Sequence, residues 1–228
     1  MRAVAATYNV QSFRAGVDRA VEVLAPERPD VVLIQESGPR RTLTRFARAM
    51  EMDLASSHRL FSRVQNAVLF RAPWRLSKAE VHDLEPQGRT HPRGFIVAHL
   101  RAHGTRLTAV SAHLGLVPLE RFHHARVVAD HLAGVDGALI LGVDVNEGPQ
   151  GPTARWMSER LFDAGVQPGG DPGPTFPAWD PTVRIDFVFV NQEAPVIRCW
   201  VSSGQAAAKA SDHRPVLAEV DLSAGSDG

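Results

Sequence analysis

Polar side chains that could do chemistry stand where apolar runs of the sequence meet loops. The set is Asn9, Glu36, His113, Asp144, Asn146, Asp186, Asp212 and His213. The first five follow an apolar run and the last three precede one. In a sheet with antiparallel neighbours, the end of one strand lies beside the start of the next. We therefore expect these side chains to converge on one edge of a sheet.

Carboxylates dominate this set, with two imidazoles and two carboxamides beside them. Crowded carboxylates raise one another's pKa unless a cation neutralises them. Carboxylate and carboxamide oxygens without thiolates suit a hard ion, Mg²⁺ or Mn²⁺. An imidazole backed by an acid then serves in proton transfer. The predicted chemistry is metal-assisted hydrolysis of a phosphoester.

Each position is a weak signal by itself, because an acid at a strand end is usually a solvated or capping residue. Two other acid–histidine steps, His82–Asp83 and Asp130–His131, are interpreted in that ordinary way, as surface residues, the second on a helix face. The hypothesis therefore depends on the joint placement of the whole set at strand edges.

The elements that must position these side chains follow from hydrophobic periodicity. Predicted strands cover residues 2–10, 31–34, 66–71, 95–100, 106–112, 138–143, 185–190, 196–201 and 215–222. Predicted helices cover 17–24, 43–50, 118–132 and 153–162, and the Gly- and Pro-rich residues 169–181 form a loop. A strand–helix–strand opening indicates a parallel pair, and His103–Gly104 predicts the turn of a hairpin. The pattern favours an α/β sandwich of mixed sheets.

Length and composition limit the possibilities further. With 228 residues, 44% of them hydrophobic, the chain has material for one sizeable core, which we place in residues 1–222, before a disordered tail at 223–228. The single cysteine, Cys199, excludes an internal disulfide and a multi-cysteine zinc site.

Charge and hydropathy bear on partners and location. The 25 basic and 25 acidic residues cancel, which argues mildly against a tight binder of duplex DNA. The N-terminal residues lack a long apolar segment and a small-residue cleavage site. We therefore expect a cytoplasmic protein without a membrane span, and no obligate protein partner is evident.

The ordered motifs resemble those of a known family. They are Tyr8–Asn9, Ile34–Gln35–Glu36, the strand 66–71, Ser111–Ala112–His113–Leu114, Asp144–Val145–Asn146, Arg184–Ile185–Asp186–Phe187 and Ser211–Asp212–His213. In this order they resemble the endonuclease/exonuclease/phosphatase superfamily, and Glu120–Arg121 and Thr175–Phe176–Pro177 look like its small bacterial hydrolases. One departure is that Val143 separates Gly142 from Asp144, whereas the family usually has glycine directly before the aspartate.

The resemblance implies a four-layer α-β-β-α sandwich of two mixed sheets flanked by helices. It also implies that Glu36, assisted by Asn9 and Asp212, holds the Mg²⁺ or Mn²⁺ ion. Asp144 is then expected to orient or deprotonate the attacking water, with Asn146 fixing its position.

The same resemblance implies roles around the phosphoryl group. His213, aligned by Asp186, is expected to contact that group. His113 is expected to stabilise charge on the phosphoryl oxygens or to protonate the leaving group, and Asn66 to touch a non-bridging oxygen. Two loops could face the substrate, 87–94 with Arg93 and 116–126 with Arg121, although both also fit ordinary solvated segments.

The leading hypothesis is hydrolysis of a phosphodiester or phosphomonoester, with nucleic acid and small-molecule substrates both open. The alternative is a catalytically inactive member that binds a phosphorylated ligand or a partner; loss of a polar edge residue would mark it, and none is missing. The sequence has no Gly-x-Ser-x-Gly, Gly-x-x-x-x-Gly-Lys, His-Glu-x-x-His or Gly-Asn-His motif, which disfavours other common hydrolases.

Overall fold

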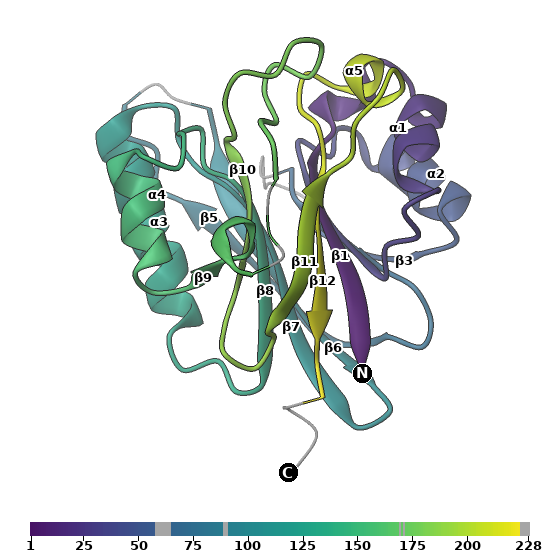
Figure 1. The fold of residues 1–228 in the computed structure, drawn as a ribbon, viewed down its shortest axis with the longest axis horizontal. Coiled ribbons are helices and arrows are strands. Elements are labelled where there is room, and N and C mark those ends of the chain that lie inside the picture. The colour runs from purple at the N-terminus through teal and green to yellow at the C-terminus, as the bar shows by residue number, and fades with distance from the viewer. Residues whose placement is uncertain (58–64, 89–90, 169, 171, 224–228) are drawn as a thin grey trace.

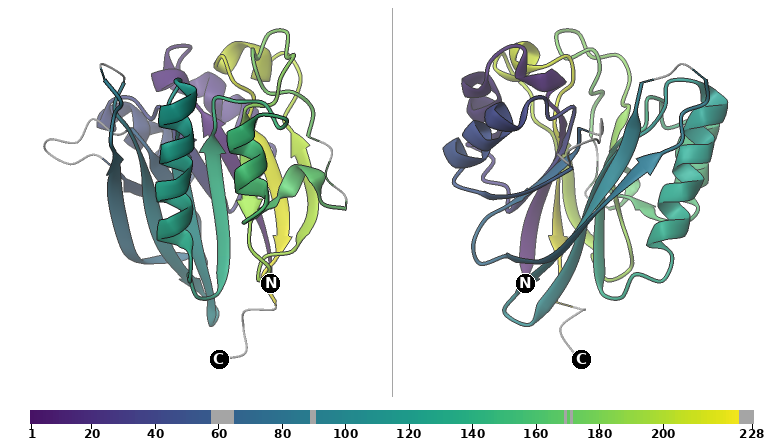
Figure 2. Two further views of the ribbon diagram at one scale, coloured as in Figure 1. Left: turned by 90° about the vertical axis from the view of Figure 1, so that its left-hand side faces the viewer. Right: turned by 180° about the vertical axis from the view of Figure 1, so that it is seen from behind.

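Two sheets packed face to face form the centre of the molecule, and helices cover both outer faces (Figure 1). The computed structural model describes residues 1–57, 65–88, 91–168, 170 and 172–223. Each sheet has six strands and mixes parallel with antiparallel pairs. The predicted α-β-β-α sandwich is confirmed, and Figure 2 shows the teal and green helices on one outer face and the purple and blue ones on the other.

The first sheet has the strand order β11-β12-β1-β2-β4-β3. Its strands are β1 (Arg2–Asn9), β2 (Val31–Gln35), β3 (Asp53–Ser56), β4 (Ala67–Phe70), β11 (Val196–Val201) and β12 (Val216–Asp221). Only β1 and β2 run parallel among its described pairs, and α1 (Val17–Leu24) makes the crossover between them. Helix α2 (Arg40–Ala49) follows β2 on the same outer face.

The second sheet has the order β5-β6-β7-β8-β10-β9. Its strands are β5 (Arg75–Leu84), β6 (Arg93–Ala102), β7 (Thr105–His113), β8 (Ala138–Asp144), β9 (Phe162–Asp163) and β10 (Asp186–Val190). The parallel pair β7 and β8 is connected by α3 (Pro118–Leu132), and α4 (Pro152–Ser158) lies beside α3. His103 and Gly104, both at positive φ, form the predicted turn between β6 and β7.

Strand alternation explains how the layers hold together. In β2, Val31 and Leu33 point into the core between the sheets, while Val32 and Ile34 pack beneath α1 and α2. Both faces of the central strands are therefore buried, so these strands read as continuous apolar runs. Cys199 of β11 also lies in the inter-sheet core, where burial raises the pKa of its thiol to about 12.

Several elements differ from the sequence-based expectation. The helix predicted over 153–162 ends at Ser158, and Phe162 pairs with β10 as part of β9. Strands β3 and β5 were not predicted, because most of the β5 side chains are exposed and its apolar alternation is weak. Short elements η1 (Gln11–Phe13), η2 (Ala164–Val166) and α5 (Ala207–Ala210) were not predicted either.

The sequence also predicted a C-terminal tail and no membrane-spanning helix. Residues 224–228 of the predicted tail lie outside the described residues. Within the described part of the chain, no helix is both long and apolar enough to cross a lipid bilayer.

Candidate active site

Strand register brings the predicted polar residues to one end of the sandwich. In the second sheet, Asp144 at the end of β8 pairs with both His113 at the end of β7 and Asp186 at the start of β10. In the first sheet, β1 runs from the N label of Figure 1 to this same end, where Asn9 pairs with Gln35. The polar ends of both sheets therefore face one another. The sequence predicted convergence on one edge of a single sheet, whereas these residues come from the ends of two facing sheets.

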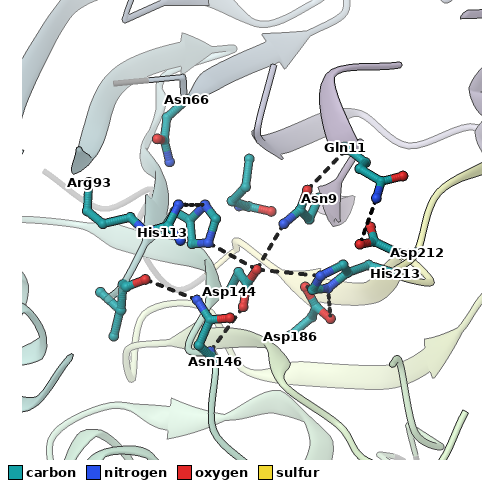
Figure 3. A network of polar contacts seen from close by, with 12 residues as sticks. Asn9, Gln11, Asn66, Arg93, His113, Asp144, Asn146, Asp186, Asp212 and His213 are labelled. Carbon is teal, nitrogen blue, oxygen red and sulfur yellow. Dashed lines mark hydrogen bonds and ion pairs between the residues drawn. The ribbon is translucent and has the colours of Figure 1, made fainter. Parts of the chain in front are cut away.

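Asp144 lies at the centre of this site (Figure 3). Its Oδ2 atom accepts a hydrogen bond from Asn9 Nδ2 at 2.9 Å, lies 3.3 Å from His113 Nε2, and lies 3.8 Å from His213 Nε2. Its Oδ1 atom accepts from the backbone N–H of Asn146 at 3.0 Å. The side chain is buried, and contacts with residues of both sheets fix its position.

His213 pairs with Asp186. Its Nδ1 atom lies 2.9 Å and 3.1 Å from the two carboxylate oxygens, and both residues are buried. Burial alone would lower the pKa of His213, but the carboxylates of Asp186 and Asp144 outweigh it and raise the pKa to about 10. Nδ1 therefore donates to Asp186, and the protonated Nε2 is directed at Asp144.

His113, unlike His213, is neutral. Arg93 Nη1 lies 3.2 Å from its Nδ1 atom. A guanidinium can only donate, so Nδ1 accepts and the ring proton lies on Nε2, which faces Asp144. Burial lowers the pKa of His113 to about 3, so the imidazole is neutral. One carboxylate thus stands between a charged and a neutral histidine.

The backbone around the site adopts the left-handed region at residues other than glycine. Glu36 has φ 48° and Asn146 has φ 58°, and Gln11, Ser12 and Phe13 form a run at φ 45°, 55° and 55°. Such conformations cost free energy and gather at functional sites. At Asn146, hydrogen bonds to Asp144 and from the side-chain Nδ2 to the carbonyl of Leu114 at 3.0 Å hold the turn in place.

The residues predicted to hold a metal lie on the first-sheet side of the site. Asp212 accepts hydrogen bonds from Gln11 Nε2 at 2.9 Å and from Ser211 Oγ at 3.3 Å. Asn9 Oδ1 accepts the backbone N–H of Gln11 at 3.1 Å. Glu36 lines a cavity of about 320 Å³. The side chains of Asn9, Glu36 and Asp212 all offer oxygen atoms as metal ligands, and oxygen ligands fit a hard divalent cation.

Two further features of the site are relevant to metal binding. Asn66, Arg93 and His113 line the cavity together with Glu36. In addition, ligand atoms of Asp144, Asp186 and His213 lie within 4.8 Å of one another. The roles assigned to individual ligands remain predictions.

The predicted substrate-binding residues occupy different surroundings. Asn66 is buried and its Nδ2 donates to Ser111 Oγ at 3.2 Å, at the wall of the cavity. Arg93 also lines the cavity, and residues 89–90 of its loop lie outside the described residues. Arg121 is absent from the described lining of that cavity.

Arg121 instead holds the loop after β8. Its Nη1 donates to the carbonyl of Asn146 at 2.8 Å and to the carbonyl of Leu116 at 3.1 Å, and Nη2 lies 3.4 Å from Glu147. Glu147 in turn accepts the backbone N–H of Thr153 at 2.7 Å, at the start of α4. Substrate contact by Arg121 remains a prediction, and these contacts favour a positioning role.

Sequence reasoning missed a buried polar bridge between the two sheets beneath the site. Gln35 Nε2 lies 3.1 Å from both Thr7 Oγ1 and Ser111 Oγ and 3.3 Å from the carbonyl of Gly142. Ser111 Oγ donates to the carbonyl of Ile34 at 2.6 Å. The available signal was Gln35, a glutamine that ends an otherwise apolar strand.

The bridge also explains why a glycine stands two residues before Asp144. A Cβ atom on Gly142 would lie 2.7 Å from side-chain atoms of Thr7 and Leu33, which belong to the other sheet. Glycine therefore permits the sheets to approach closely beneath the site, and both Asp144 and Asn146 keep their expected places.

Solved structures with this fold are numerous, although none of the following exceeds 20% identity to the chain. The endonuclease/exonuclease/phosphatase of Bacteroides vulgatus superposes with a TM-score of 0.83 at 17% identity, covering 97% of this chain and 99% of that one. The mannosyl-6-phosphatase of Bacteroides thetaiotaomicron gives 0.81 at 19% identity, covering 96% and 99%. D. rerio TDP2, complexed with a single-strand DNA product, gives 0.79 at 17% identity, covering 96% and 99%.

These likenesses establish the fold, and a sequence comparison establishes the family. No curated protein matches the sequence. The model of the Endonuclease/Exonuclease/phosphatase family matches residues 6–213, which include every residue of the site described above. The chain belongs to the endonuclease/exonuclease/phosphatase family.

Proposed function

We propose that this protein hydrolyses a phosphoester bond by in-line attack of water, assisted by Mg²⁺ or Mn²⁺. The observation that carries the proposal is the placement of Asp144 between His113 and the Asp186-paired His213, next to oxygen atoms suited to ligate a hard cation. Members of the family are phosphoester hydrolases. Because no residue of the predicted set is missing, an inactive, purely binding protein is disfavoured.

His213 and Asp186 form the cationic part of the site. The carboxylate of Asp186 fixes the Nδ1–H of His213, which leaves Nε2–H to donate to a phosphoryl oxygen. The raised pKa keeps this imidazole positively charged at neutral pH, so it stabilises negative charge that develops on phosphorus-bound oxygens.

Asp144 and His113 act on the other reacting groups. Asp144 is an acceptor held by Asn9 and Asn146, so it can orient the attacking water and take a proton from it. His113 is neutral with its proton on Nε2, and its pKa of about 3 makes it a poor proton donor near pH 7. This favours a hydrogen bond from His113 to a phosphoryl oxygen over protonation of the leaving group.

We infer the metal requirement from the oxygen ligands that the site offers. Glu36, assisted by Asn9 and Asp212, would hold the ion. A bound divalent cation supplies Lewis-acid neutralisation of the phosphoryl charge. Asp212 is already oriented by Gln11 and Ser211, so it presents its carboxylate in a fixed position.

The substrate class is open between small phosphoesters and nucleic acid, since structural neighbours include a mannosyl-6-phosphatase and a TDP2 bound to single-strand DNA. A panel of sugar phosphates, nucleotides, phosphodiesters, and single- and double-stranded DNA separates them. A nucleic-acid substrate should lose affinity steeply with added salt, and a small phosphoester should not. Failure to hydrolyse any phosphoester with metal present would reject the proposed function.

A further inference from the structure

A second group of potential metal ligands lies on the outer face of the second sheet, where the edge strand β5 meets α3. Glu80 and His82 are two residues apart in β5 and therefore project from the same face. His131 projects from the last turn of α3. One ligand atom from each of these three side chains lies within 4.8 Å of the others.

Packing holds the two imidazoles of this group. The ring of His82 stacks on Phe95 of β6, with centroids 4.6 Å apart and planes inclined by 17°. The ring of His131 lies 4.1 Å from that of His82 and 5.3 Å from Phe95, in an edge contact. His82 is half-buried against Phe95, whereas Asp83 is exposed, so the surface interpretation of this pair holds fully only for Asp83.

Glu80 supplies the carboxylate of this group. Lys78 Nζ lies 2.9 Å from its Oε1 atom, and His99 Nε2 lies 3.2 Å from the same oxygen. Both of these contacts engage the same carboxylate oxygen, Oε1.

The donor chemistry differs from that of the active site. Two imidazoles and one carboxylate form the ligand set of three-ligand zinc sites, in which water takes the fourth place. Ligands bonded at ~2.0–2.1 Å to a tetrahedral ion stand about 3.3 Å apart. The three side chains must therefore draw together slightly, and the exposed His131 and half-exposed Glu80 have room to do so.

We propose that Glu80, His82 and His131 form a second metal site, selective for Zn²⁺ or a similar transition ion over Mg²⁺. An ion bound there joins α3 to β5, the edge strand of the second sheet. Its effect is structural: it stabilises the folded chain without taking part in the chemistry around Asp144. The competing description is that the histidines only pack against Phe95.

Isothermal titration of Zn²⁺ into the whole protein, in a buffer with excess Mg²⁺ to occupy the active site, tests the proposal. The matched variants are His131→Asn and His123→Asn, since His123 is also an exposed histidine of α3 but does not belong to the group. Wild type and His123→Asn should bind one zinc ion that His131→Asn binds at least tenfold more weakly. The same ion should raise the Tm of the first two proteins only.

Glu80→Gln, which keeps the size of the side chain, provides a second variant and should weaken zinc binding as well. Identical zinc isotherms for wild type, His131→Asn and Glu80→Gln would overturn the proposal and leave the packing description. This outcome is independent of phosphoesterase activity, because the readouts are binding and thermal stability.

Discussion

Nδ1 of His213 lies 2.9 Å from Oδ2 of Asp186 and 3.1 Å from Oδ1, although the two residues are 27 positions apart in the sequence. The carboxylate fixes both the ring orientation and the tautomer of the histidine. His213 Nε2 is thereby aimed at Asp144, which the second histidine, His113, approaches at 3.3 Å. The geometry separates a cationic imidazole from a neutral one within a single site.

Replacing the fixing carboxylate should therefore disable the site without unfolding the chain. We expect Asp186→Asn to lower kcat for the best phosphoester by about 10²–10⁴-fold, in the range of a positioned acid–base group. Asp130→Asn, an exposed carboxylate of α3, is the control and should leave kcat unchanged. Near-normal turnover by Asp186→Asn, with circular dichroism like that of wild type, would remove Asp186 from the mechanism.

The charge on His213 should also affect stability as a function of pH. Its pKa in the folded, metal-free protein is raised to about 10, above the roughly 6.5 of an unfolded histidine. The stabilisation is thus fully present below about pH 6.5 and is lost as the pH rises toward 10. We expect the difference in unfolding free energy between wild type and His213→Gln, measured in chelator, to shrink over that interval. A difference that stays constant would show that the neighbouring carboxylates do not raise the pKa of His213.

Arg121 provides a test between positioning and substrate contact. Its hydrogen bonds to the carbonyls of Asn146 and Leu116 are made by a buried guanidinium, so Arg121→Lys loses part of the fork that holds this loop. A shifted loop should lower kcat by up to about 10²-fold and change KM little. A raised KM with normal kcat would instead support the substrate contact predicted from the sequence.

Gly142 should be intolerant of even one added methyl group. Its Cβ would lie 2.7 Å from Thr7 and Leu33, and overpacking of this kind costs about 1–3 kcal/mol. We expect Gly142→Ala to lower the free energy of unfolding in urea by that amount. Gly173→Ala, where an added Cβ meets nothing within 4 Å, should have almost no effect. Equal stability of the two variants would mean that the sheets can separate beneath the site at little cost.

The sequence was sufficient to predict the sandwich and the polar residues that gather at strand ends, but not that these ends belong to two facing sheets. Continuous apolar runs mark strands buried on both faces. Asp144 stands at the end of such a run and Asp186 at the start of another. The edge strand β5 was not predicted because most of its side chains are exposed and give little apolar alternation. The helix predicted over 153–162 was too long because Phe162, although apolar, leaves the helix to pair in β9.

The charge states in the site were beyond sequence reasoning. His113 and His213 are the same residue type at strand edges, yet one has a lowered and the other a raised pKa. The difference arises from the tertiary surroundings, since burial lowers the pKa of His113, whereas the carboxylates of Asp186 and Asp144 outweigh burial at His213. Gln11, which lies in the short element η1 and orients Asp212, gave no periodic signal either.

The most direct test of metal-assisted hydrolysis is the initial rate on the best phosphoester for protein stripped of metal, before and after Mg²⁺ or Mn²⁺ is added, with Asp144→Asn in parallel. We expect no measurable rate in chelator, full recovery of wild type with the ion, and a recovered rate for Asp144→Asn that is lower by orders of magnitude. Hydrolysis that persists in chelator, or full recovery of Asp144→Asn, would contradict the account.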